Sequence, residues 1–221
     1  MADRPAADPG GSDRDRPPVS VLFSGGKDSS LAALLLEPFH DVTLVTVGFG
    51  VDAAPEPGRG VTRATVHARE AAAALGLPHR VVSLDESVAR EAAERVLADG
   101  YPREAIQSIH ERALEAVAPA AAAVADGTRR DDRVPRLDRS AMQSLEDRHD
   151  VDYLVPLRGF GRGAVDRLAR TELEVALGPS DELQKADYET AIRTLLRREH
   201  GHERVADLFP DHTQSRVVGR R

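Results

Sequence analysis

The stretch from residue 24 to residue 30 reads SGGKDSS and holds the residue types best suited to chemistry in this chain. Its members are two glycines, a lysine, an aspartate and three serines: Ser24, Gly25, Gly26, Lys27, Asp28, Ser29 and Ser30. Glycine lets the backbone approach a ligand closely, and the serine hydroxyls and the Lys27 ammonium can contact phosphate oxygens. A carboxylate repels phosphate, so Asp28 fits either as a helix N-cap or as a ligand of phosphate-bound Mg²⁺. The stretch therefore predicts a phosphate-binding loop that works with a metal ion.

The flanking segments place this loop between a strand and a helix. Residues 19–23 form a continuous apolar run, typical of a strand buried on both faces, and residues 28–36 have a helical pattern. In parallel sheets, ligands bind beyond the carboxyl ends of the strands, where helix N-termini attract anions. The Walker motif G-x-x-x-x-G-K-[ST] is not matched, because Asp28 follows Lys27 and no glycine lies five residues before Gly26. A glycine turn capped by serine or aspartate is the alternative that needs no ligand.

Four further strand-like segments follow and alternate with helical ones. The strand-like segments are residues 42–49, 79–84, 120–125 and 151–157. The alanines of 120–125 would equally suit a helix. The helical patterns cover residues 61–75, 87–97, 103–117 and 140–148. Strands separated by helices predict an α/β fold, in which a parallel five-stranded sheet carries helices on both faces.

The chain divides into three parts by composition and pattern. Residues 1–17 are rich in Pro, Gly, Asp and Arg, which predicts a disordered N-terminal tail. Residues 18–170 hold the sheet, and residues 171–221 form a mostly helical C-terminal extension, in which 185–200 is the clearest helix. No apolar segment approaches the roughly 20 residues of a membrane span, and the N-terminus lacks the apolar centre of a signal peptide. We therefore expect a cytoplasmic protein without a membrane partner.

SGGKDSS after the first strand resembles the PP-loop of the N-type ATP pyrophosphatases, the adenine nucleotide alpha hydrolase-like (HUP) group. That group includes NAD, GMP and asparagine synthetases and tRNA sulfur-inserting enzymes. ADGTRRDDR, at 125–133, resembles the G-T-N-x-D-D segment of several members, above all the sulfur transferase of nickel-pincer cofactor synthesis, with Arg129 replacing the asparagine. VPLRGFGRGAVDRLAR, at 155–170, is more weakly similar to a P-L-x…K-x-E-V-R-x-L-A segment. The resemblance spans residues 18–170, and the tail is similar to small archaeal PP-loop proteins.

The resemblance implies an AMP-forming ligase or transferase that uses ATP and Mg²⁺. Such enzymes split ATP between the α and β phosphates, pass AMP to an acceptor and release pyrophosphate. Residues 24–30 would hold the pyrophosphate end, with Lys27 and Asp28 as catalytic residues and Asp28 as the metal ligand. The backbone from Val47 to Phe49 would contact the adenine.

The second matching stretch would close over the bound nucleotide. The resemblance places Gly127 and Thr128 on the nucleotide, and Asp131 or Asp132, as further catalytic residues, near the metal or the acceptor. It also assigns Arg129 to the acceptor. The alternative for the two aspartates is a solvated charge run, because arginines flank them.

Two more residues are candidates for acceptor binding. Arg158 lies in the third matching stretch, and Lys185 is one of only two lysines in a chain whose other basic residues are all arginine. Lysine is a compact charge that arginine does not always replace, so Lys185 predicts a contact to phosphate or acceptor. A chance surface lysine is the alternative.

Composition narrows the function. The chain has no cysteine, so any sulfur chemistry would need sulfur from outside. A net charge of −7 and only 4% aromatic residues disfavour a general nucleic-acid binder. The leading hypothesis is adenylation of an acceptor for attack by ammonia, an amine or sulfur. The alternatives are a non-catalytic ATP or AMP sensor or partner subunit, and a tRNA-modifying (thiolation-type) PP-loop protein. The expected partners are an amidotransferase, a sulfur carrier or tRNA, and we expect a homo-oligomer.

Overall fold

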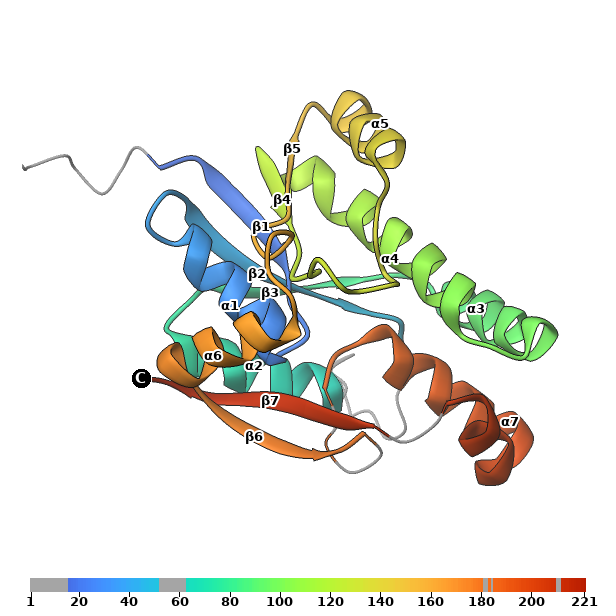
Figure 1. The fold of residues 1–221 in the computed structure, drawn as a ribbon. Helices are drawn as coiled ribbons and strands as arrows, with labels where there is room; N and C mark the ends of the chain where they lie inside the picture. The colour runs from blue at the N-terminus through green and yellow to red at the C-terminus, as the bar shows by residue number, and fades with distance from the viewer. Residues whose placement is uncertain (1–15, 52–62, 181–182, 184, 210–211) are drawn as a thin grey trace, which may run out of the picture.

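A five-stranded parallel sheet lies at the centre of this computed structural model, which describes residues 16–51, 63–180, 183, 185–209 and 212–221. Its strands are β1 (Pro18–Leu22), β2 (Asp41–Gly48), β3 (His79–Ser83), β4 (Ala123–Ala125) and β5 (Asp152–Leu154). They are ordered β3-β2-β1-β4-β5, and every pairing is parallel (Figure 1). The predicted fold class is confirmed. Residues 1–15 of the predicted disordered tail lie outside the described part of the chain.

The central strand β1 is buried on both faces, as its continuous apolar run predicts. Val19 and Val21 pack into one hydrophobic cluster, and Leu22 packs into a second cluster on the opposite face of the sheet. The same layering holds for β4, where Ala123 and Ala125 face the first cluster and Val124 the second. β4 is a strand, although its alanines would suit a helix, because it is paired on both sides within the sheet.

Helices cover both faces of the sheet. The first cluster contains apolar side chains of α1 (Lys27–Leu36), α2 (Arg63–Leu75) and α6 (Arg162–Glu172). The second contains those of α3 (Glu86–Asp99), α4 (Arg103–Val117), α5 (Arg139–His149) and α7 (Tyr188–Leu208), and the 3₁₀ turn Ala118–Ala120 joins α4 to β4. Within the described ranges, no helix is both long enough and apolar enough to cross a bilayer.

The C-terminal extension adds a helix and a two-stranded antiparallel sheet. β6 (Leu173–Pro179) pairs with β7 (Thr213–Arg220), and α7 lies between them in the sequence. The predicted helix is present, whereas the strand pair was not predicted. β7 lies against α1 and α2, at the side of the main sheet where the loop after β1 emerges (Figure 1). The extension therefore reaches the neighbourhood of SGGKDSS.

Candidate functional site

The loop after β1 turns sharply into the start of α1. Gly25 has a φ of 78°, a left-handed conformation that favours glycine, and a Cβ there would lie 3.4 Å from the backbone of Ala68. Gly26 is the N-cap of α1 and has no side chain with which to cap the helix. The sequence alternative in which Asp28 caps α1 is therefore wrong, since Asp28 lies inside the first turn. The Lys27 N–H donates to the Ser215 hydroxyl, whereas the N–H groups that follow it and the helix dipole make this end of α1 attractive to an anion.

Hydrogen bonds of the serines hold the turn of the loop in shape. Ser29 and Ser30 both donate hydroxyl hydrogen bonds to the Gly26 carbonyl, at 3.2 and 2.9 Å, and Ser30 is fully buried. The backbone N–H of Ser24 donates to the Ser29 hydroxyl at 3.3 Å. These bonds hold the turn in shape, so Ser30 supports the loop from behind.

A cavity of about 900 Å³ opens beyond the carboxyl ends of β1, β2 and β4. Its volume is in the range of small-molecule sites in proteins. Ten of the residues that the sequence singles out line it: Ser24, Lys27, Asp28, Ser29, Val47, Gly127, Thr128, Arg129, Asp132 and Lys185. SGGKDSS, the GT-containing loop and the lysine of the extension thus meet around one space.

The candidates described next do not line the cavity. Gly25, Gly26 and Ser30 form the turn behind the wall. Phe49 is buried, with its ring centroid 6.3 Å from that of Tyr188. Arg158 is exposed, and its Nη1 contacts the sulfur of Met142 at 3.0 Å.

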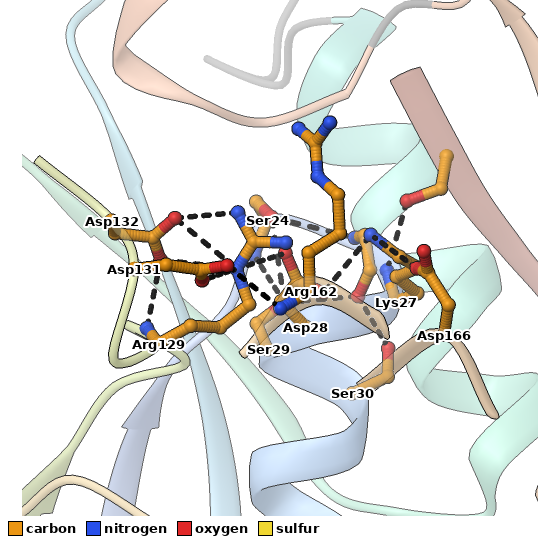
Figure 2. A network of polar contacts seen from close by, with 12 residues as sticks. Ser24, Lys27, Asp28, Ser29, Ser30, Arg129, Asp131, Asp132, Arg162 and Asp166 are labelled. Carbon is orange, nitrogen blue, oxygen red and sulfur yellow. Dashed lines mark hydrogen bonds and ion pairs between the residues drawn. The ribbon is translucent and has the colours of Figure 1, made fainter. Parts of the chain in front are cut away.

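Asp28 lies between two cations at the mouth of the loop (Figure 2). Its Oδ1 is 3.1 Å from Lys27 Nζ, and its Oδ2 is 3.8 Å from Arg129 Nε. Lys27 also lies 3.6 Å from Asp166, on α6. Oδ1 of Asp28 is buried and makes no hydrogen bond, so its ion pair with Lys27 leaves it able to accept another partner. Lys27 and Arg129 thus both carry carboxylate partners at this end of the cavity.

The loop after β4 packs directly on the first turn of α1. A Cβ on Gly127 would lie only 2.7 Å from the Asp28 carbonyl carbon and 2.7 Å from the Ser29 nitrogen. No side chain fits there without moving backbone. Glycine at position 127 is therefore needed for this loop to approach the first turn of α1 so closely.

The two neighbouring aspartates fix the rest of this loop. Asp132 accepts hydrogen bonds from the backbone N–H and the guanidinium of Arg129, the shortest at 2.5 Å, and this pairing raises the pKa of Arg129. Asp131 accepts from the backbone N–H of Arg162, the first residue of α6, at 2.9 Å, which lowers the pKa of Asp131 (Figure 2). Arg129 replaces the asparagine of the resembling motif, and Asp132 orients it toward the cavity.

The C-terminal extension contacts the loop at residues 24–30 through two backbone N–H groups and one side-chain hydroxyl. Val217 N–H donates to the Gly25 carbonyl at 2.9 Å, and Ala186 N–H donates to the Ser24 carbonyl at 3.1 Å. Lys27 N–H donates to the Ser215 hydroxyl at 3.3 Å. Sequence reasoning missed Ser215 and Val217, although the run TQSRVV contains the β-branched residues that are common in strands.

A family model described as "Family of unknown function (DUF7411)" matches residues 18–219. The chain belongs to this family. The match includes β6, α7 and β7, so the extension is part of what DUF7411 members share.

The relatives of this DUF7411 chain agree with the fold. "Uncharacterized protein MJ0690" of Methanocaldococcus jannaschii is 42% identical over 202 residues, 91% of this chain and 95% of that protein. A crystal structure described as "predicted subunit of tRNA methyltransferase", also from M. jannaschii, superposes with a TM-score of 0.82 at 38% identity, covering 93% of this chain and 98% of that one. The tRNA-specific 2-thiouridylase MnmA of Dehalococcoides mccartyi is 43% identical over 83 residues, 37% of this chain and 22% of that enzyme. With the sheet order and the loop after β1, these findings support a PP-loop type fold.

A buried polar network in this DUF7411 chain lies under the cavity and was not predicted. Asp126, at the end of β4, accepts hydrogen bonds from His110 Nε2 at 2.9 Å and from the Tyr153 hydroxyl at 2.5 Å. Its other oxygen accepts from the N–H and the hydroxyl of Thr128, at 2.8 and 2.7 Å. His110 Nδ1 lies 3.1 Å from the hydroxyl of Tyr188, the first residue of α7. His110, Asp126 and Tyr188 all line the cavity.

Hydrogen bonding keeps Asp126 ionised. Burial would raise the pKa of its carboxyl, but the bonds from His110, Tyr153 and Thr128 outweigh burial and hold the pKa below the ordinary 3.8. Burial and the Asp126 charge raise the pKa values of both tyrosines, so both are neutral donors near pH 7.

Proposed function

We propose that the chain binds ATP with Mg²⁺ in the 900 Å³ cavity and transfers AMP to an acceptor, with release of pyrophosphate. The observation that carries the proposal is the N-terminus of α1, which lies at the cavity beside Lys27 and Arg129 and whose N-cap, Gly26, has no side chain. A helix start with two cations beside it suits a departing pyrophosphate. The local similarity to the tRNA-specific 2-thiouridylase MnmA and the PP-loop type fold support the same reaction class.

Asp28 fits the Mg²⁺ that such a reaction needs. Its buried Oδ1 accepts no hydrogen bond, so an oxygen ligand is available. In the described ranges, no three His, Cys, Asp or Glu side chains are placed to hold a metal by themselves. This agrees with Mg²⁺, which commonly takes one or two carboxylates and completes its shell with phosphate oxygens and water. Bound there, the ion would neutralise charge on the pyrophosphate.

The chain's own groups would divide the work of binding. Ser24, Ser29 and the first amides of α1 would hold the pyrophosphate end, because they lie at the helix start. Lys27 would move from its carboxylate partners to a phosphate oxygen, and Arg129 is charged at any working pH. The apolar wall at Val47, which belongs to β2, suits the adenine, and Phe49 would act only through its backbone.

The acceptor would lie on the side of the cavity that the C-terminal extension forms. Lys185 lines this side, with Nζ 3.3 Å from Asp187 Oδ2, and Arg129 faces it from the loop after β4. Arg158 lies outside the wall, so we propose acceptor contacts for Lys185 and Arg129 alone. The attacking group would be ammonia, an amine or externally supplied sulfur, since the chain has no cysteine.

A product assay tests the proposal. The protein is incubated with Mg²⁺, high KCl and ATP, with and without a cell extract of small molecules and RNA, and the nucleotides are separated. We expect AMP and pyrophosphate, formed faster with extract. Asp28→Ala should abolish them, whereas Asp147→Ala, an exposed carboxylate on α5, should not. ADP and phosphate as products would show that ATP is split between its β and γ phosphates, which would contradict the proposal.

A second candidate is tRNA modification. Two relatives have names that refer to tRNA: a predicted subunit of tRNA methyltransferase and a tRNA-specific 2-thiouridylase. Treating the extract with ribonuclease separates this candidate from a small-molecule acceptor, because only an RNA acceptor would be lost. Tight ATP binding without turnover would instead favour the sensor or partner-subunit role.

A further inference from the structure

We propose that Tyr188, His110 and Asp126 form a proton-accepting relay for the nucleophile that displaces AMP. This inference deepens the proposed function and rests on it for the identity of the reaction. Tyr188 would be the catalytic residue that contacts the nucleophile, and His110 and Asp126 would position and activate it. The nucleophile would be a group with an N–H, S–H or O–H proton to give up.

An ionised Asp126 and a neutral His110 imidazole together set the hydrogen-bond directions in the chain of three residues. Asp126 is ionised and can only accept, so His110 must donate from Nε2. A neutral imidazole that donates from Nε2 has an acceptor at Nδ1. Tyr188 therefore donates its hydroxyl proton to Nδ1, at 3.1 Å. The arrangement has the logic of a hydroxyl–imidazole–carboxylate triad, with tyrosine as the hydroxyl.

The network is buried, and burying polar groups costs free energy that apolar side chains would not cost. His110 is 2% exposed and Asp126 is 3% exposed, and such buried polar groups are costly unless every partner is present. All four hydrogen-bonding positions on the Asp126 carboxylate are used, by His110, Tyr153 and Thr128. An imidazolium formed at His110 would thus face a fully oriented carboxylate.

The network is joined to the phosphate site by one short segment. Asp126 holds Thr128 with one oxygen and His110 with the other, and Gly127 between them touches the first turn of α1. Tyr188 follows the segment whose Ala186 binds the Ser24 carbonyl. The relay is therefore built from the same loops that enclose the phosphate end, on the side where an acceptor would lie.

The proton transfer balances without any further reactant. The nucleophile gives its proton to the Tyr188 oxygen as its lone pair forms the bond to the adenylated atom. The original hydroxyl proton of Tyr188 passes to His110 Nδ1, and the imidazolium is stabilised by Asp126. AMP leaves with the electron pair of the broken bond, and His110 returns the proton to solvent through Tyr188 when the products depart.

A sulfonyl fluoride labelling experiment tests the relay without the unknown acceptor. Benzenesulfonyl fluoride reacts with a hydroxyl that an adjacent base deprotonates, and labelled residues are found by peptide mass spectrometry. We expect Tyr188 to react faster than Tyr101, which is 54% exposed and has the Arg103 guanidinium 5.5 Å from its ring centroid. His110→Ala should slow labelling about 100-fold or more, and added imidazole should restore part of the rate. Tyr153→Phe removes a bond to the same carboxylate and should slow labelling less than about tenfold.

Further outcomes separate the relay from the proposed function. If Tyr188 is not labelled preferentially, the relay is wrong, because it requires a hydroxyl that a molecule in the cavity can reach. If His110→Ala does not fold, ¹⁵N NMR of histidine in the wild-type protein decides, and a proton on Nδ1 at neutral pH would overturn the relay. The reagent 5′-fluorosulfonylbenzoyl adenosine should label Tyr188 and be blocked by ATP. Fast labelling by the small reagent without ATP protection would leave the relay standing and remove the ATP site.

Discussion

Replacement of Gly127 by alanine is the sharpest test of the phosphate-loop geometry. The new Cβ would meet the Asp28 carbonyl carbon and the Ser29 nitrogen at 2.7 Å, whereas ordinary contacts begin at 3.4 Å. Both neighbours are backbone in a helix start, so they cannot rotate away as a side chain would. The loop after β4 must retreat from α1, and overpacking of this kind costs about 1–3 kcal/mol.

The strain should appear in stability and in ligand affinity. For a chain of this size, each kcal/mol lowers Tm by roughly 2–4 °C. If Mg-ATP binding requires the loop to return to its place, the same cost weakens binding by about 5- to 150-fold. Gly159→Ala is the matched control, because a Cβ there meets no atom within 4 Å.

Thermal unfolding and titration calorimetry with Mg-ATP measure both effects. Gly127→Ala should lower Tm and ATP affinity together, and Gly159→Ala should change neither by a comparable amount. A Gly127→Ala protein with wild-type Tm would refute the close contact between the loop and α1. Normal ATP affinity with a lowered Tm would instead show that the contact is structural and that ATP does not depend on it.

Three other changes test separate parts of the site. Asp28→Asn should abolish Mg²⁺-dependent AMP formation while Tm stays within a few degrees, and retained turnover would remove Asp28 from the metal site. Folding lowers the pKa of Asp126, so its contribution to stability is complete above pH 3.8 and is lost as the pH falls through the folded value. When the free energy of unfolding is measured by chemical denaturation at a series of pH values, its fall toward acid pH should be smaller in Asp126→Asn than in the wild type. An equal fall in both proteins would contradict the lowered pKa of Asp126. Ser215→Ala removes the partner of the Lys27 N–H and should cost about 0.5–1.5 kcal/mol in denaturant unfolding, whereas no loss would show that water replaces the hydroxyl.

Local signals made the sheet and the turn from β1 into α1 predictable. A strand buried on both faces needs a continuous apolar run, and residues 19–23 supply one directly before the glycines. The loop's position then follows from the rule that ligands bind at the carboxyl ends of parallel strands. The N-cap was harder to assign, because Asp28 is a good capping residue by type, yet the turn at Gly25 starts the helix at Lys27.

The buried network and the strand pair depended on contacts that no local pattern encodes. His110, Tyr153 and Tyr188 come from α4, β5 and α7, Asp126 directly follows β4, and only the fold brings them together. β6 and β7 are separated by the whole of α7, and each has an exposed apolar residue, Leu177 and Val218, that weakens the alternation. A strand pair of this kind is stabilised by what it packs on, here α2 and the phosphate loop.

The extension is best understood as a wall of the site. Its backbone supplies Val217 N–H and Ala186 N–H to carbonyls of the phosphate loop, and Ser215 receives the Lys27 N–H. These are contacts to the backbone of SGGKDSS, so they hold the loop whatever the acceptor is. The side chains of the same segments, Lys185 and Tyr188, face the cavity. Under the proposed function, one piece of chain would therefore both fix the loop at residues 24–30 and present groups to the acceptor, which would couple the geometry of ATP activation to the choice of acceptor.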